Sequence, residues 1–230
     1  MLSKLVEILF VALLVAGVPA LSYLSTRGNQ IRLAPRSALY FSVVISQWLL
    51  AGLGMGVTAL TFGSFRALGF RSVPAAALIR WTALLAIISL LVMGIILLLE
   101  QRGWWPPETD LVHLLLPETA SEKLWAVLIL APTAAFCEEY LYRGYLLAAL
   151  SQWLHSVGWG WVASSAFFGL AHVYQGASGM LRAAVLGALL AYPVVLLGSL
   201  YPSMAAHLVI DAVAFGWLGP SLLRRSPTPP

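Results

Sequence analysis

The feature that most constrains the fold is a series of seven apolar segments, each long enough or nearly long enough to cross a lipid bilayer. A helix needs about 20 mostly apolar residues to span the ~30 Å hydrocarbon core. In lipid, the backbone must satisfy its own hydrogen bonds. The sequence therefore predicts an all-α fold, a polytopic membrane helix bundle with about seven (six to eight) transmembrane helices in a single membrane domain over 1–230. The segments run over residues 5–24, 38–63, 78–99, 124–152, 159–175, 181–199 and 201–219.

The composition agrees with a chain that lies in lipid. Of the 230 residues, 60% are hydrophobic and only 10% are charged, whereas an ordinary soluble protein carries about 25% charged residues. The net charge of +4 is spread along the connections without a basic run, so we expect membrane lipid and no nucleic acid as a partner. The single cysteine, Cys137, excludes an internal disulfide and a Cys-rich metal motif.

The N-terminus has some features of a secretory signal peptide, namely Lys4, the apolar run 5–18 and Ala20. Glu7 interrupts that pattern and many apolar segments follow, so we expect a retained first helix. Residues 1–100 are interpreted as N-terminal spanning helices. The expected location is that of an integral membrane protein in the bacterial cytoplasmic membrane.

Five acidic or histidine side chains fall inside the apolar segments of the C-terminal half. Most acidic residues lie in the polar linker 100–122, where ionisation is inexpensive. A charged side chain at the bilayer centre costs ~3 kcal/mol on insertion scales, so intramembrane ionisable residues mark functional sites by default. The five are Glu138, Glu139, His172, His207 and Asp211.

The spacing of these residues predicts which of them share a helix face. Glu139 and Arg143 are four residues apart and can pair, whereas Glu138 is rotated by ~100° from Glu139. The same spacing places His207 with Asp211, and Phe168 with His172. At ~1.5 Å of rise per residue, the depths of Glu138, His172, His207 and Asp211 are compatible with one cavity between three helices.

Such a cavity could hydrolyse a substrate with water in two ways. A carboxylate and a histidine can activate a water molecule as general base and partner, while a second His–Asp pair stabilises an oxyanion. Alternatively, Glu138, His172, His207 and Asp211 could bind a divalent metal such as zinc. The residues leave both routes open, and no cofactor is required by the sequence.

Three motifs occur in order on successive segments: E-E-x-x-x-R (Glu138, Glu139, Arg143), F-x-x-x-H (Phe168, His172) and H-x-x-x-D (His207, Asp211). In these motifs the chain resembles the CPBP family, the CAAX protease and bacteriocin-processing or Abi family, which includes the type II Ras-converting CAAX endopeptidases. The resemblance covers roughly residues 120–220. It implies a catalytic core there, an intramembrane endopeptidase activity and a membrane-associated protein or peptide as substrate, with prenylated CAAX proteins as one candidate class.

The resemblance also implies a role for each motif residue. Glu138 would be the base that activates water, with His172 as its partner. His207 and Asp211 would bind the oxyanion, and Glu139 and Arg143 would position the site. Enzymes that cleave prenylated CAAX proteins often have Asn where this chain has Asp211. An ionised carboxylate cannot donate a hydrogen bond, so it is better suited to orient a histidine or to bind metal, as a metalloprotease would require.

Three alternative functions use other features or other chemistry. Gly176-Ala177-Ser178-Gly179 matches the G-x-S-G pattern of rhomboid intramembrane serine proteases, and a Ser178–His207 dyad could transfer an acyl group. The buried ionisable groups could instead form a proton or cation path in a transporter. The third alternative is a non-enzymatic immunity or scaffold protein that keeps the family fold.

Overall fold

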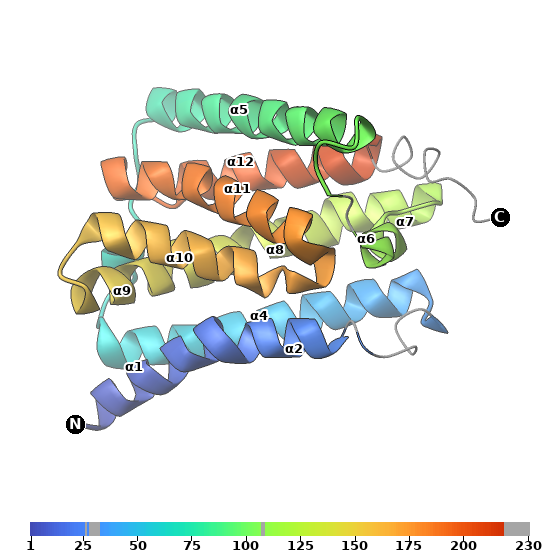
Figure 1. The fold of residues 1–230 in the computed structure, drawn as a ribbon. Helices are drawn as coiled ribbons and strands as arrows, with labels where there is room; N and C mark the ends of the chain where they lie inside the picture. Colours follow the sequence, from blue (N-terminus) through green and yellow to red (C-terminus); the bar gives the residue numbers. More distant parts are fainter. Residues whose placement is uncertain (26, 28–32, 107–108, 219–230) are drawn as a thin grey trace.

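The structure, a computed structural model, describes the chain except for residues 26, 28–32, 107–108 and 219–230, and the described part is helical without a strand (Figure 1). The N-terminal half contains α1 (Leu2–Ala12), the π-helical η1 (Leu13–Gly17), α2 (Val18–Ser25), α4 (Arg36–Thr61), the 3₁₀ turn η2 (Phe65–Leu68), α5 (Ala75–Gln101) and α6 (Asp110–Leu115). One long helix then runs through α7 (Ala120–Trp125), the π-helical η3 (Ala126–Leu130), α8 (Ala131–Glu138), the π-helical η4 (Glu139–Leu146) and α9 (Leu147–Trp153). The chain continues through α10 (Val157–Ala171), η5 (Val173–Gln175), α11 (Gly176–Leu197), α12 (Tyr201–Val213) and η6 (Ala214–Leu218).

Five of these helices are long and apolar enough to cross a membrane: Leu2–Ser25, Arg36–Thr61, Ala75–Gln101, Ala120–Trp153 and Val173–Leu197. Two further helices correspond to the remaining predicted segments, the shorter apolar α10 and the combination of α12 with η6. The prediction of an all-α polytopic membrane bundle is therefore confirmed.

The fourth spanning helix begins at Ala120, four residues before the predicted start. A capping box explains this boundary. The Thr119 hydroxyl accepts a hydrogen bond from the Glu122 backbone N–H at 3.2 Å, and the Glu122 carboxylate accepts one from the Thr119 N–H at 3.0 Å. The linker 100–122 also contains the short helix α6, which apolar periodicity alone did not indicate.

Helix α10 ends at Ala171, earlier than the predicted end at residue 175. Its 15 residues extend ~22 Å at 1.5 Å per residue, less than the ~30 Å hydrocarbon core. Figure 1 accordingly shows α10 stopping short of the end of the bundle that α7 reaches. Gly176, with φ of 80°, adopts a backbone conformation that favours glycine, and the chain turns back there into α11. His172 thus lies in a turn, and its predicted place inside a spanning helix is wrong.

The C-terminal helices pack around the long helix that contains α8 and η4 (Figure 1). Helix α8 contacts α4 on one side and α12 on another, while α12 also packs against α5. Helix α10 packs between α9 and α11, and α1 packs against α4. Glu138, the last residue of α8, therefore lies near residues of both the N-terminal and the C-terminal half.

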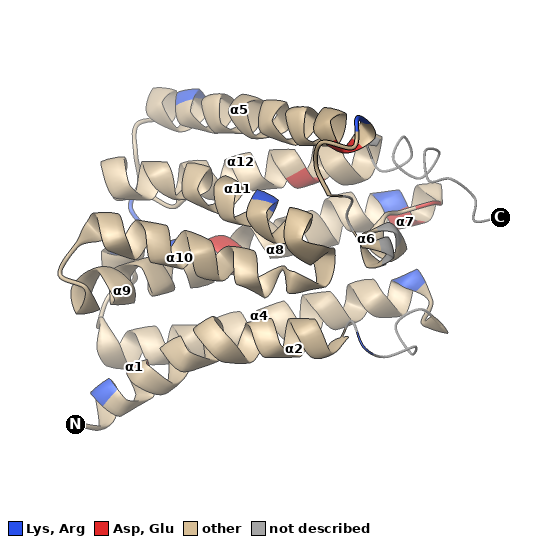
Figure 2. Cartoon of the chain, in the orientation of Figure 1, with Lys and Arg blue, Asp and Glu red and all other residues tan. Residues whose placement is uncertain are grey.

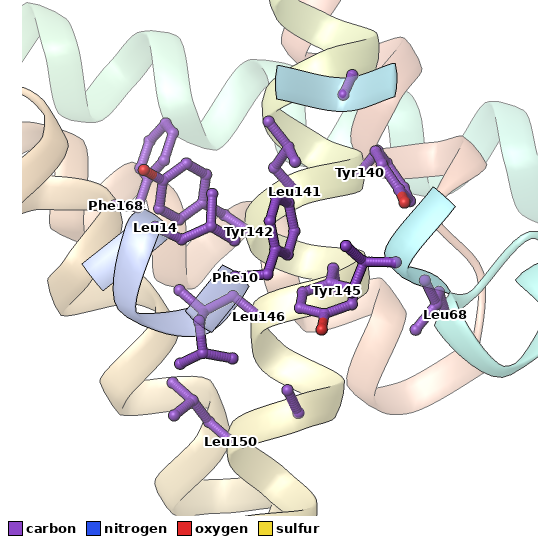
Figure 3. Packing of buried hydrophobic residues seen from close by; sticks show 14 of the residues in the cluster. Phe10, Leu14, Leu68, Tyr140, Leu141, Tyr142, Tyr145, Leu146, Leu150 and Phe168 are labelled. Atoms are coloured by element: carbon purple, nitrogen blue, oxygen red, sulfur yellow. The ribbon is translucent and has the colours of Figure 1, made fainter. Parts of the chain in front are cut away.

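The largest apolar cluster surrounds η4, the segment that follows Glu138 (Figure 3). Tyr140, Tyr145 and Leu146 are fully buried there. The ring of Phe10, from the first helix, meets the Tyr145 ring edge-on at a centroid distance of 4.9 Å. Burial of such large aromatic side chains stabilises the packing of the first helix against the segment that carries Glu139 and Arg143.

Candidate active site

Four of the residues singled out from the sequence line one cavity of about 260 Å³ between α4, α8, α12 and the α10–α11 turn: Glu138, His172, His207 and Asp211. We call it the glutamate–histidine cavity. Residues of α6, among them Val112 and Leu115, form part of its wall. Apolar side chains make up most of the remaining lining, so the polar groups form a small cluster in a largely apolar space.

Glu138 is held by a residue from the N-terminal half. Its Oε1 accepts a hydrogen bond of 2.7 Å from Nε2 of Gln47 in α4, and its Oε2 lies 4.0 Å from Nε2 of His207. The Glu138 side chain is 17% exposed, whereas that of Glu139 is completely buried. The two adjacent glutamates therefore have separate environments, as their difference in angle around the helix predicts.

His207 lies between three carboxylates. Its Nδ1 is 2.8 Å from Oε1 of Glu139, and its Nε2 is 3.6 Å from Oδ2 of Asp211. Because a carboxylate only accepts, the Glu139 contact places a proton on Nδ1. Nε2 is then an acceptor in the neutral ring and a donor in the imidazolium form. The predicted shared face of His207 and Asp211 is confirmed.

Glu139 and Arg143 form the predicted pair, buried completely in the bundle. Oε1 of Glu139 lies 3.1 Å from Nη1 of Arg143, and the side chains are 0% and 2% exposed. Arg143 also donates from Nε to the Gly187 carbonyl at 3.4 Å and stacks over the Phe168 ring at 3.8 Å. Both members of the pair lie in the π-helical η4, and π-helical turns frequently occur at functional sites.

Gly187 leaves the space that the Arg143 guanidinium occupies. A Cβ at this position would lie 3.2 Å from Phe168 Cδ1 and 3.3 Å from Arg143 Nη2. Gly187→Ala should therefore displace the pair, destabilise the protein by ~1–3 kcal/mol and reduce activity. Thermal unfolding and hydrolysis in detergent measure both effects. Gly94→Ala is the matched control, because a Cβ on Gly94 would meet nothing within 4 Å; equal behaviour of the two variants would contradict the steric argument.

His172 is oriented by the last turn of α10, the helix that precedes it. Its Nδ1 lies 2.8 Å from the Phe168 carbonyl oxygen, and the two rings are 4.5 Å apart. Since a carbonyl only accepts, Nδ1 carries the proton and Nε2 has a lone pair. The predicted shared face of Phe168 and His172 is confirmed, and Phe168 supports both His172 and Arg143.

The described residues contain no group of three or more His, Cys, Asp or Glu side chains arranged to hold a metal ion. Within the set predicted as ligands, Nδ1 of His207 is directed to Glu139 and its other nitrogen lies 3.6 and 4.0 Å from two carboxylates. The role of these four residues as metal ligands stays a prediction.

Gln47 contacts Glu138 but was not predicted as a site residue. This amide lies within the apolar segment 38–63, and the rule that buried polar groups in a membrane mark function could have identified it. Its Nε2 donates a hydrogen bond to Glu138, whereas its buried Oε1 has no hydrogen-bond partner among the described residues.

A second group of cavity residues was also not predicted. Arg182 donates a hydrogen bond of 3.0 Å to Gln175, and Gln175 donates one of 2.8 Å to the Tyr174 hydroxyl. All three residues line the glutamate–histidine cavity.

Ser178, the serine of the G-x-S-G pattern, is engaged elsewhere. Its Oγ accepts a hydrogen bond of 2.5 Å from Trp105 Nε1 and donates one of 2.9 Å to Glu100 Oε1. Ser178 is also not among the described residues that line the glutamate–histidine cavity. Its contacts join the start of α11 to the end of α5, which is a structural role.

Ser178→Ala should therefore leave the hydrolysis rate within about twofold of the wild type. Loss of two buried hydrogen bonds should lower the free energy of unfolding by ~1–3 kcal/mol. A rate assay and a thermal unfolding curve on the same preparation test both statements. A fall in rate to the uncatalysed background, with the fold intact, would instead support the serine mechanism.

Comparison with known protein families gives one match. The family model described as Type II CAAX prenyl endopeptidase Rce1-like matches residues 120–213. Comparisons with curated proteins and with solved structures give no match. The matched region begins at the first residue of α7 and ends at the last residue of α12, and it contains every residue of the three motifs. Gln47 lies outside it.

Proposed function

We propose that this integral membrane protein is an intramembrane endopeptidase that hydrolyses a peptide bond with water activated by Glu138. The match of residues 120–213 to the Rce1-like type II CAAX prenyl endopeptidase family model supports the proposal. The observation that carries the proposal is the meeting of Glu138, His172, His207 and Asp211 in one largely apolar cavity. We further propose that 120–220 is the catalytic core and that the protein acts in a bacterial cytoplasmic membrane.

In the first step, Glu138 accepts a proton from water while the water oxygen attacks the peptide carbonyl carbon. Gln47 fixes Oε1 of Glu138, so Oε2 is the oxygen available as base. Nε2 of His172 has the lone pair that can accept the second water hydrogen and hold the nucleophile in line. Neither role requires a group beyond the side chains of this chain.

In the second step, the tetrahedral intermediate is stabilised and collapses. His207 in its imidazolium form can donate from Nε2 to the oxyanion, while Glu139 holds its Nδ1 at 2.8 Å. Asp211 lies 3.6 Å from Nε2 of His207. Its carboxylate orients the imidazolium ring and balances its positive charge, but it does not donate a hydrogen bond to the oxyanion. The C–N bond then breaks, the proton on Glu138 passes to the leaving amine, and a carboxylate and an amine are released.

The lining of the cavity supports a substrate that enters from lipid. Apolar residues from both halves of the chain surround the polar cluster, among them Val43, Leu130, Leu186 and Phe215. Such a wall suits an apolar peptide segment or a lipid group attached beside the cleaved bond, because burial of apolar surface favours binding. A prenylated CAAX-type C-terminus is the substrate class that we propose first.

The proposal is tested with the purified protein in lipid nanodiscs. Synthetic peptides with a CAAX C-terminus, farnesylated or unmodified, are incubated in H₂¹⁸O, and products are identified by mass spectrometry. We expect one ¹⁸O atom in the newly formed carboxylate and faster cleavage of the farnesylated peptide. Equal rates of cleavage of the two peptides would contradict the proposed preference for prenylated substrates. If no peptide is cleaved, and if wild-type and Glu138→Gln cells have the same membrane peptides, the protein is a scaffold.

A further inference from the structure

A second cavity, larger than the glutamate–histidine cavity, lies at the end of the bundle where α4 ends and α5 begins. Its lining includes Arg143, the partner of Glu139. Its volume is about 550 Å³. Its walls come from the connection 64–71, from η4 and α9, and from the end of α11. Three arginines line it, Arg66, Arg71 and Arg143, and none of the described residues that line it is acidic. We call it the arginine-lined cavity.

The positive charge of this cavity is largely uncompensated. Neither Arg66 nor Arg71 has a side-chain hydrogen bond or ion pair with any residue in the described part of the chain. Arg143 is buried and paired with Glu139, yet its two Nη atoms lack partners with hydrogen-bond geometry. The Ser151 hydroxyl, also in the wall, is buried without a partner among the described residues. Unsatisfied buried donors in a native fold require an explanation, and a bound acceptor supplies one.

The cavity also has an apolar wall, formed by Leu147, Val194 and Val195, with Val157 at 52% exposure beside it. The connection between two spanning helices lies at the level of the lipid headgroups. Figure 2 shows basic ribbon segments at the end that carries the start of α5, whereas the opposite end, with α7, shows both acidic and basic segments. A group that is anionic at one end and apolar at the other matches this arrangement.

We propose that the arginine-lined cavity binds a phosphate group, carried on the headgroup of an anionic lipid, through Arg66 and Arg71 with Arg143 at its base. Arginine binds phosphate oxygens by charge-assisted hydrogen bonds, and each basic residue near a lipid surface adds to the attraction. The same chemistry would accept a free phosphate, so the test separates the two sources. The site does not depend on hydrolysis in the other cavity.

The test measures lipid retention by native mass spectrometry of the detergent-solubilised protein with phosphatidylglycerol or phosphatidylcholine. We expect preferential retention of phosphatidylglycerol, and the variant R66Q/R71Q should lower its affinity by roughly 25-fold, about fivefold per arginine. Arg80→Gln is the matched control, because Arg80 is exposed, as Arg66 and Arg71 are, but lies outside the cavity lining. Glu138→Gln should bind as the wild type does, which separates this proposal from the proposed protease function.

Inorganic phosphate identifies the source of the ligand. If phosphate at millimolar concentration displaces phosphatidylglycerol and raises the Tm of the wild type but not of R66Q/R71Q, the site takes soluble phosphate. If it does neither while phosphatidylglycerol still binds, the site is for lipid. The proposal is overturned if neither ligand binds preferentially, if R66Q/R71Q binds as the wild type does, or if Arg80→Gln loses as much affinity as the double variant.

Discussion

Glu138→Gln is expected to lower the rate of peptide hydrolysis by roughly 10²–10⁴-fold, the usual contribution of a general base, without loss of fold. The amide oxygen of glutamine can still accept the hydrogen bond that Gln47 donates at 2.7 Å, so only the ability to take a proton is removed. Turnover and Tm are measured on the same nanodisc preparation.

The control for this variant is Glu118→Gln, because Glu118 is a half-exposed partner of Arg36. That change should leave turnover unchanged. A Glu138→Gln protein that retains more than about a third of the wild-type rate would exclude Glu138 as the base, and would make His172, on the same cavity, the next residue to examine.

Arg143→Met is expected to be the most destabilising single change in the site. It leaves the fully buried Glu139 carboxylate without its cation, and breaking a buried ion pair in this way costs ~3–5 kcal/mol. The Tm should fall by on the order of 10 °C, and hydrolysis should be lost because Glu139 also holds His207. Thermal unfolding and turnover measure the two effects.

The double variant E139Q/R143M distinguishes a charge effect from a packing effect. Removal of both charges should recover at least half of the lost Tm, because no uncompensated charge remains buried. Arg36→Met, at a more exposed ion pair of 2.6 Å, should cost no more than about 1 kcal/mol. Arg143→Met would be a packing defect, and not a charge defect, if the double variant were no more stable than the single one.

The contacts that the sequence predicts correctly lie within single helices. Glu139 pairs with Arg143, His207 with Asp211 and Phe168 with His172. These pairs follow from the four-residue spacing, which is fixed by helix geometry and survives even in the π-helical η4. The number of helical segments follows in the same way from the length of apolar runs, which the bilayer thickness dictates.

The contacts that the sequence does not predict join different helices. Gln47 and Glu138 are 91 residues apart, and His207 and Glu139 are 68 apart. Such pairs depend on which helices become neighbours and on their rotation, and apolar periodicity in lipid carries little information on either. The break between α10 and α11 was predicted, but the end of α10 was placed at residue 175 and not at Ala171, because hydropathy does not mark the residue at which an apolar helix ends.

The contact between Gln47 and Glu138 has a consequence for any attempt to transplant the region that carries the three motifs. The helices that carry the three motifs cannot be moved into another protein without α4 and α6. Helix α4 supplies the hydrogen bond to Glu138, and both helices form part of the cavity wall. Two chains with the same three motifs and different N-terminal halves would therefore enclose differently shaped cavities. Substrate choice can then diverge through the N-terminal helices while the reacting groups stay the same.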